Sequence, residues 1–240
     1  MLPSELATAS DAGAVSDARK PCHPAPMKNI GILGSGAVGQ SLADGLMKHG
    51  YGVMRGSREP EKLAGWLKGA GPRASTGTFA QAARFGDAVV LAVKGTAAES
   101  AVDLCEGALA GKLVMDTTNP IANAPPEGGV VRFFTGPNES LLERLQAKAP
   151  AAHFVKAFSC VGSGFMVDPD FGGIKPTMFI CGNDATAKAQ TTALLAQIGW
   201  EVEDMGGAVA ARAIEPLCML WCIPGLLHNR WTHAFKLLKK

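Results

Sequence analysis

The sequence predicts an α/β protein built on one doubly wound, mostly parallel sheet. Short apolar runs alternate with helical patterns from residue 27 onward, and β-branched residues crowd several of the apolar runs. This alternation is typical of βαβ units around a parallel sheet. A glycine-rich motif also lies between the first apolar run and the first helical pattern, where such folds place a tight turn.

The first half of the chain contains most of the predicted sheet. We expect strands over 29–33, 52–56, 73–75, 87–93 and 112–116. The helical patterns between them cover 37–49, 60–68, 79–85 and 96–109. Gly50 suits the end of the first helix, because glycine readily adopts the left-handed conformation found after many helices. Together these elements predict one domain over 27–120.

The second half continues the alternation and is expected to complete the same sheet as a small C-terminal α/β extension over 121–240. A turn-rich stretch over 121–129 precedes predicted strands at 153–158, 177–181 and 200–204 and a helix at 184–198. A helical segment over 208–227 is expected to break at Pro224-Gly225. Arg212 and Glu215, three residues apart on that segment, are expected to form an ion pair.

The composition excludes several classes of protein. Basic residues are scattered and the formal net charge is +2, so nothing indicates nucleic-acid binding. No apolar run reaches the roughly 18 to 20 residues of a membrane span, and we expect no membrane association. Residues 1–26 lack both periodicity and the apolar stretch of a secretory signal, which predicts a disordered extension.

Six cysteines occur without a CxxC pair or zinc-finger spacing, so we predict no metal site, no disulfide framework and a cytoplasmic location. Cys218 and Cys222 would share a helix face. A redox or metal pair is conceivable there, but two ordinary buried thiols are favoured.

The glycine motif is Gly34-Ser35-Gly36-Ala37-Val38-Gly39, which matches GxGxxG between a strand and a helix. Gly34 permits the tight turn, Gly36 lets the backbone approach a pyrophosphate, and Gly39 lets the helix pack on the strand. The alternative is a glycine-rich turn of another α/β protein. The strand–turn–helix context favours a Rossmann-type dinucleotide-binding domain.

The end of the second strand predicts which dinucleotide binds. NAD-dependent enzymes usually place an acid there to bind the ribose 2′-hydroxyl. Here Ser57 and Arg58 follow the strand, and a guanidinium suits a 2′-phosphate. Lys62 could add a further positive charge. Glu59 is the alternative ribose ligand, but beside Pro60 we favour a role at a helix N-terminus. NADP(H) is therefore the predicted cofactor.

Other features narrow the class of oxidoreductase. The one tyrosine, Tyr51, is followed four residues later by Arg55 and not lysine, which excludes the Tyr-x-x-x-Lys chemistry of short-chain dehydrogenases. Only 36 residues follow Asp204, too few for a large helical dimerisation domain.

Specific motifs of the chain resemble the NADPH-dependent coenzyme F-420 (deazaflavin) reductase family. They are the glycine motif, Gly56-Ser57-Arg58, 116–120 (DTTNP), 153–158 (HFVKAF) and 211–216 (ARAIEP). The first domain also resembles the cytoplasmic half of six-transmembrane ferric reductases and the N-terminal half of pyrroline-5-carboxylate reductase.

The resemblance implies that the adenosine and phosphate part is held by Gly34, Ser35, Gly36, Ala37, Val38, Gly39, Ser57, Arg58 and Lys62. It also implies that Val93, Asn119, Pro120 and Ala157 lie near the nicotinamide. The chain departs from the family at Lys94-Gly95 and at 158–163 (FSCVGS), where the second substrate is expected.

We therefore expect an NADP(H)-dependent oxidoreductase that exchanges hydride with a deazaflavin or flavin-like small molecule. No catalytic acid–base pair is predicted, because the cofactors carry this chemistry. The alternatives are an imine reductase and a non-catalytic NADP(H) redox sensor. The apolar segment 216–227 is expected to pack on the sheet or form a homodimer contact; Trp221 stacking in an acceptor pocket is a third interpretation.

Overall fold

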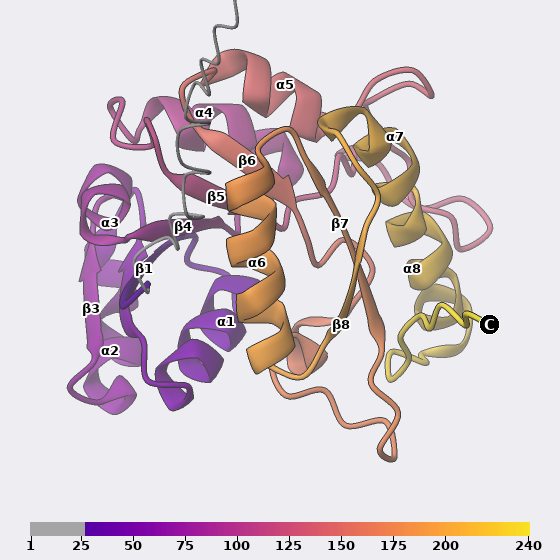
Figure 1. Ribbon diagram of the computed structural model, residues 1–240, viewed down its shortest axis with the longest axis horizontal. Helices are drawn as coiled ribbons and strands as arrows, with labels where there is room; N and C mark the ends of the chain where they lie inside the picture. The colour runs from indigo at the N-terminus through magenta and orange to yellow at the C-terminus, as the bar shows by residue number, and fades with distance from the viewer. Residues whose placement is uncertain (1–26) are drawn as a thin grey trace, which may run out of the picture.

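One sheet of eight strands runs through the whole computed structural model, which describes residues 27–240 (Figure 1). The predicted disordered extension and Cys22 lie outside the described residues. The strand order is β3-β2-β1-β4-β5-β6-β7-β8. The strands are β1 (Asn29–Leu33), β2 (Gly52–Gly56), β3 (Ala74–Gly77), β4 (Ala88–Leu91), β5 (Leu113–Asp116), β6 (His153–Lys156), β7 (Thr177–Gly182) and β8 (Glu201–Asp204).

The first six strands are parallel, while β7 runs antiparallel to β6 and β8 runs parallel to β7. This arrangement confirms the predicted doubly wound, mostly parallel α/β fold. β6, β7 and β8, which come from residues beyond 120, extend the sheet formed by β1 to β5.

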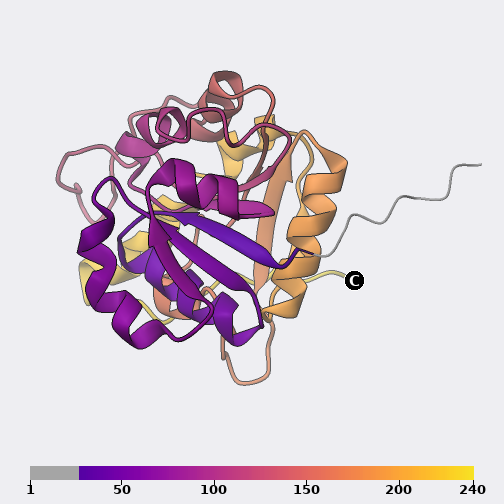
Figure 2. The ribbon, with the colours of Figure 1, turned by 90° about the vertical axis from the view of Figure 1, so that its left-hand side faces the viewer.

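Helices cover both faces of the sheet because successive strand residues point to opposite sides (Figures 1 and 2). Ile30 and Ile32 join a buried cluster with α1 and α6, whereas Leu33 joins a second cluster with α3, α4, α5 and α7. The helices are α1 (Ala37–Lys48), α2 (Ala64–Ala70), α3 (Phe79–Phe85), α4 (Ala98–Asp103), α5 (Leu141–Lys148), α6 (Ala185–Gln197), α7 (Ala211–Ile214) and α8 (Leu217–His228).

The strand order places a topological switch point between β1 and β4. From β1 the chain proceeds outward through α1 to β2 and β3, and β4 then pairs with the other side of β1. The loops that follow β1 and β4 therefore diverge at the carboxyl edge of the sheet. In open α/β sheets, ligands bind in the crevice that this divergence leaves.

Three helices differ from the sequence-based expectations. α4 was expected over 96–109 but ends at Asp103. α5 was not predicted, although Ser140 caps it by accepting from the backbone N–H of Glu143. α8 does not break at Pro224, because only the hydrogen bond of that one missing N–H is lost and the helix continues to His228. It ends at Asn229, which takes a left-handed conformation.

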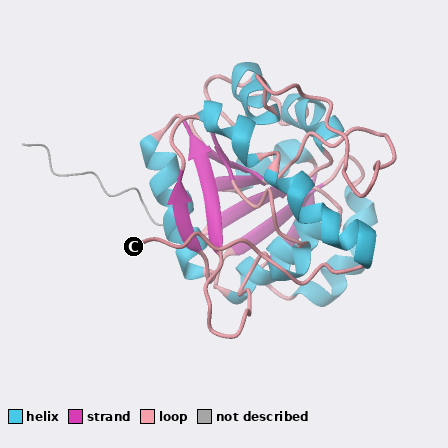
Figure 3. Cartoon of the chain, turned by 90° about the vertical axis from the view of Figure 1, so that its right-hand side faces the viewer, coloured by secondary structure: helices cyan, strands magenta, loops and turns pink. Residues whose placement is uncertain are grey.

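The C-terminal helical stretch Ala208–His228 is long and apolar enough to cross a membrane by length and composition, contrary to the expectation that no run reaches that length. Within its most apolar window, 33% of the residues are buried inside the protein, and a core helix of a soluble protein passes the same test. After α8, the last residues run as an extended segment beside β7 (Figure 3). Thr177 donates its backbone N–H to the carbonyl of Phe235 there.

Candidate functional site

A cleft of about 330 Å³ lies at the switch point, between the loops that follow β1, β2 and β4. It brings together many of the residues predicted to bind the dinucleotide. Those residues are Gly34, Ser35, Gly36, Ser57, Arg58, Lys62 and Val93. The predicted Ala37, Val38 and Gly39 form the first turn of α1 directly behind the glycine loop, and do not line the cleft itself.

Two glycines of the loop have the close contacts that their predicted roles require. Gly34 has φ +151°, and a Cβ there would lie 2.1 Å from the carbonyl oxygen of Ala92. A Cβ on Gly39 would lie 2.7 Å from the carbonyl oxygen of Gly34, which explains the close packing of α1. At Gly36, by contrast, a Cβ would meet no protein atom within 4 Å. Protein packing therefore does not require glycine at position 36, whereas a ligand lying against the backbone there would require it.

The residues after β2 form a polar corner of the cleft. Ser57 is buried and accepts a hydrogen bond from the backbone N–H of Glu59, while Arg58 is exposed. Lys62 lies 2.6 Å from Oε1 of Glu59, and both side chains are more than half exposed. Glu59 makes no side-chain hydrogen bond to the helix N-terminus, so its observed role is to pair with Lys62. A 2′-phosphate would meet a hydroxyl, a guanidinium and an ammonium at this corner.

Of the predicted nicotinamide residues, Val93 lines the cleft, whereas Asn119, Pro120 and Ala157 lie farther along the same sheet edge, outside it. Asn119 follows β5 and donates from Nδ2 to the carbonyl of Ser159, 3.1 Å away, which follows β6. Oδ1 of Asn119 and Oγ of Ser159 are both buried and have no hydrogen-bond partner. Buried polar atoms without a partner are uncommon in folded proteins, which distinguishes these two from the rest of the sheet edge.

The backbone between Ala157 and Ser159 is strained. Phe158 has φ +61° although it carries a bulky side chain. A non-glycine residue in this conformation costs about 1 to 2 kcal/mol, and such residues cluster at functional sites. The strain is held by packing, since the Phe158 ring is buried and meets Trp200 edge to face with centroids 6.3 Å apart.

A buried ionic cluster fixes the ends of β5 and β6 beside these residues. Lys156 contacts Asp116 at 2.5 Å and Glu215 at 2.8 Å, and it donates to the carbonyl of Thr118. Burial alone would lower the pKa of Lys156, but the two carboxylates outweigh it and raise that pKa. Glu215 also accepts from the backbone N–H groups of Leu141 and Leu142.

The ion pair predicted between Arg212 and Glu215 is therefore wrong. Arg212 instead pairs with Glu143 on α5, at 2.7 Å. The helical spacing was compatible with a pair, but Glu215 points into the core toward Lys156, where a buried carboxylate gains more from a buried cation.

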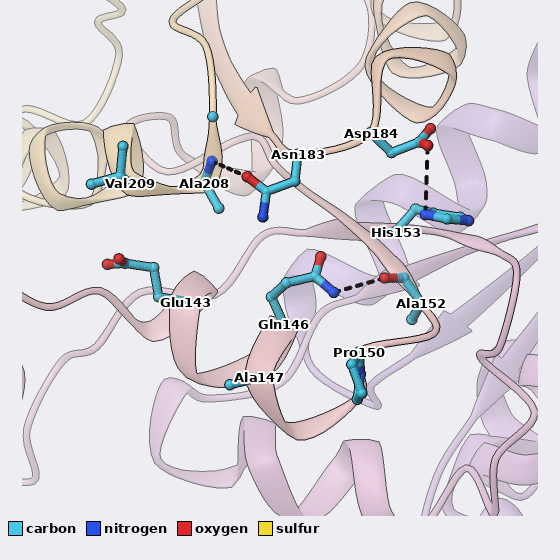
Figure 4. A pocket seen from close by; sticks show the side chains of 11 residues that line it. Glu143, Gln146, Ala147, Pro150, Ala152, His153, Asn183, Asp184, Ala208 and Val209 are labelled. Atoms are coloured by element: carbon cyan, nitrogen blue, oxygen red, sulfur yellow. Dashed lines mark hydrogen bonds and ion pairs between the residues drawn. The ribbon is translucent and has the colours of Figure 1, made fainter.

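Histidines do not line the cleft within residues 27–240. His153 starts β6, whereas the cofactor loops follow the opposite ends of the parallel strands. It lies in a separate open groove with Glu143, Asn183 and Asp184, and its Nδ1 is 3.7 Å from Oδ2 of Asp184 (Figure 4). His233 contacts the carbonyl of Trp221 in the C-terminal segment.

The five described cysteines are free thiols, and Sγ of Cys218 lies 4.0 Å from Sγ of Cys222. Burial raises the pKa of Cys105, Cys160 and Cys181 to about 12. Such thiols stay protonated and behave as apolar core groups.

Several cleft residues were not singled out from the sequence as a binding set. They are Phe79, Ala92, Lys94, Ala97, Ser100, Ala101 and Leu104. All lie on α3, at the end of β4, or on the turn and helix that follow it, and the switch-point topology would have indicated these elements. Lys94 was noted only as a departure from the family.

Comparisons with known proteins identify the family of this chain. Residues 29–120 match the family model described as NADP oxidoreductase, coenzyme F420-dependent. A solved structure from Arthrobacter sp. FB24, described as an F420-dependent NADP reductase, is 30% identical with a TM-score of 0.82. The alignment covers 89% of this chain and 100% of that one. The chain belongs to the F420-dependent NADP oxidoreductase family.

This membership makes the chain an NADP(H)-dependent oxidoreductase. Among curated proteins, the Metalloreductase STEAP3 of Rattus norvegicus is 29% identical over 208 residues, or 85% of this chain. The chain spans only 40% of that relative. An imine reductase of Streptomyces aurantiacus is 18% identical with a TM-score of 0.60, covering 83% of this chain and 63% of that one, and shares the fold alone.

Proposed function

We propose that this family member transfers hydride between NADP(H) and a deazaflavin or flavin-like ring. The observation that carries the proposal is the chemistry of the cleft. Its charged groups are Arg58, Glu59, Lys62 and Lys94, which suit a phosphorylated dinucleotide, and Val93 at its far end leads to the place proposed for the nicotinamide. A direct hydride transfer needs orientation and exclusion of water but no acid–base pair.

We place the adenosine end of the cofactor at the polar corner and the diphosphate against the glycine loop. Ser57, Arg58 and Lys62 would contact the 2′-phosphate, and Arg58 supplies the fork-shaped donor that suits it. The diphosphate would lie over Gly36, where the backbone is exposed and no side chain intervenes. The N-terminus of α1 faces the same position and favours negative charge.

We place the nicotinamide beyond Val93, toward Asn119, Pro120 and Ala157. A carboxamide carries one N–H₂ donor and one carbonyl acceptor. The unpartnered atoms Oδ1 of Asn119 and Oγ of Ser159 offer an acceptor and a hydroxyl donor of matching kind. The ionic cluster of Lys156 holds the loop of Asn119 in place, because it binds the carbonyl of Thr118.

The acceptor is tested by an NADPH-oxidation screen with deazaflavin, FMN, FAD, ferric chelates, quinones and pyrroline carboxylate. We expect the highest turnover with the deazaflavin and lower turnover with FMN. Turnover with ferric chelates alone, and none with any isoalloxazine or deazaflavin ring, would contradict the proposal.

Imine reduction is the alternative reaction. It differs from hydride transfer to a deazaflavin because a proton must also be delivered to the nitrogen. We expect substitution of His153, His228 or His233 to leave the chemical step within about tenfold of normal. A general acid or base contributes roughly 10²- to 10⁴-fold. A thousandfold loss in one histidine variant with intact NADPH affinity would favour the imine reductase.

We also propose that the protein works in the cytoplasm as a homodimer. Its described cysteines are free thiols, in keeping with a reducing compartment. Leu220, Leu226 and Leu227 on α8 are each more than 40% exposed and would be covered in a dimer. Light scattering on the purified protein tests this, and a monomer at high concentration would contradict it.

A further inference from the structure

Two cationic side chains are almost fully buried, and their surroundings differ. Lys156 is 0% exposed and contacts two carboxylates. Arg55, on β2, is 1% exposed, and no ion pair to it exists within residues 27–240. A buried charge is costly unless an opposite charge is near. Among the described groups, none forms an ion pair with Arg55, and only the carboxylate of Asp44 opposes its charge from farther away.

The carboxylate of Asp44 acts on Arg55 without forming an ion pair with it. Burial lowers the pKa of Arg55, and the charge of Asp44 on α1 offsets only part of that shift, so the pKa lies below its usual value. Oδ1 of Asp44 accepts from Nε1 of Trp66 at 2.7 Å, and the guanidinium of Arg55 lies over the Trp66 ring at 4.7 Å. Nε of Arg55 is buried without a hydrogen-bond partner.

The donors of Arg55 point at the underside of the glycine loop. Nη2 lies 3.2 Å from the carbonyl oxygen of Gly36 and 3.5 Å from that of Gly34. In a trans peptide, the N–H points away from the carbonyl of the same unit. The N–H groups of Ser35 and Ala37 therefore point away from Arg55, on the side of the loop that is open to solvent. Two peptide dipoles thus lie in line between the buried cation and the place proposed for the diphosphate.

We propose that Arg55 is a positioning residue for the dinucleotide diphosphate. Its charge orients and polarises the peptide groups of the glycine loop, and the bound diphosphate supplies the counter-charge that the fold lacks. Arg55 does not touch the ligand. The proposal rests on the placement of the diphosphate at the glycine loop given under the proposed function.

The role of the charge is tested by three substitutions at one position. Arg55→Lys keeps the charge, Arg55→Gln keeps an N–H donor without charge, and Arg55→Met keeps neither. The probes are ADP-ribose, which has the diphosphate but no 2′-phosphate, and 2′-AMP, which has only the 2′-phosphate. Calorimetry on the full chain measures both affinities, and the melting temperature of the ligand-free protein is recorded for each variant.

We expect Arg55→Gln and Arg55→Met to weaken ADP-ribose binding by roughly tenfold, the scale of one partly screened charge interaction. Arg55→Lys should stay within about threefold of the wild type, and 2′-AMP binding should be unchanged in all three. The melting temperature of Arg55→Met should not fall, because an unpaired buried charge has been removed. A merely structural support would instead lower stability and both affinities together.

A second variant makes the test independent of whether Arg55 variants fold. Asp44→Asn keeps the acceptor for Trp66 and removes the opposing charge, so ADP-ribose affinity should rise about two- to threefold. Unchanged affinity in both Arg55→Gln and Asp44→Asn would overturn the role of Arg55. Undiminished ADP-ribose binding in Gly36→Val would instead show that the diphosphate does not bind at the glycine loop. The proposal for Arg55 would then also be contradicted.

Discussion

The ammonium group of Lys156 lies 2.5 Å from Oδ2 of Asp116, and neither side chain is exposed. These residues end the adjacent parallel strands β6 and β5, and they are paired in the sheet register. Glu215, which precedes α8, completes the cluster. One buried cation therefore ties the adjacent strands β5 and β6 to the C-terminal helices, directly beside the loops where we place the nicotinamide.

Removing this cation should destabilise the fold strongly. Lys156→Met would leave two buried carboxylates without a counter-charge, which costs about 3 to 5 kcal/mol of unfolding free energy. Urea unfolding measures the change. The control is Arg132→Met, whose ion pair with Glu127 is largely exposed and should change stability by less than about 1 kcal/mol. Equal small effects of the two substitutions would contradict the structural role of the cluster.

The same cluster predicts how stability depends on pH. Because the pKa of Lys156 is raised in the folded state, the folded protein holds this proton more tightly than the unfolded chain. The stabilisation is fully present below the unfolded lysine pKa of about 10.4 and is lost as the pH rises through the folded pKa. Unfolding free energy should therefore fall above that pH. The substitution Lys156→Arg replaces the ammonium with a guanidinium, which stays charged throughout this range.

Urea unfolding of the wild type and of Lys156→Arg between about pH 9 and pH 12, on either side of the lysine pKa, isolates the contribution of Lys156 to the unfolding free energy. We expect a steeper decline in the wild type. Parallel declines would show that other groups cause the alkaline loss of stability.

The glycine loop offers a matched pair of substitutions. Gly36→Val should abolish NADPH binding while the melting temperature changes little, because its Cβ meets no protein atom within 4 Å. Gly34→Ala should instead impair folding, because its Cβ would lie 2.1 Å from the carbonyl oxygen of Ala92. Thermal unfolding and nucleotide titration separate the two effects. Normal NADPH affinity in a folded Gly36→Val protein would exclude the loop as the diphosphate site.

Cofactor choice depends on Arg58. Arg58→Ala should weaken NADPH binding by about 1.5 to 3 kcal/mol, the range for hydrogen bonds to charged groups, with little change for NADH. Glu59→Gln is the matched control, since it removes the partner that holds Lys62 at 2.6 Å and should leave or increase NADPH affinity. Equal losses for NADPH and NADH in Arg58→Ala would contradict the assignment of the 2′-phosphate corner.

Local signals in the sequence predicted most of the fold. The glycine motif lies between β1 and α1 as predicted, and the apolar runs correspond to strands of the sheet. The helix predicted over 79–85 is α3. α5 was missed because it lies in a loop-like region, although Ser140 and Glu143 carry a capping signal. The break expected at Pro224 did not occur, because α8 loses only the hydrogen bond of the missing N–H and continues to His228.

Long-range relationships in the candidate site could not be predicted in the same way. Arg55 lies in a five-residue strand whose pattern does not show that its side chain turns under the glycine loop. Asn119 and Ser159 are forty residues apart and meet only because β5 and β6 are neighbours. Glu215 and Lys156 meet for a similar reason, and helical spacing alone indicated the wrong partner for Glu215.

The most direct test of the central claim follows one deuterium atom. NADPH labelled with deuterium on one face of the nicotinamide C4 is mixed with excess enzyme and an oxidised deazaflavin in a single turnover. We predict that the label appears in a C–D bond of the reduced deazaflavin ring. We also predict that its transfer slows the observed rate, because the protein holds the two reacting atoms at roughly 3 to 3.5 Å. NADPH oxidation that leaves no deuterium in the ring, with the label on one face of C4 and, in a second experiment, on the other, would contradict direct hydride transfer.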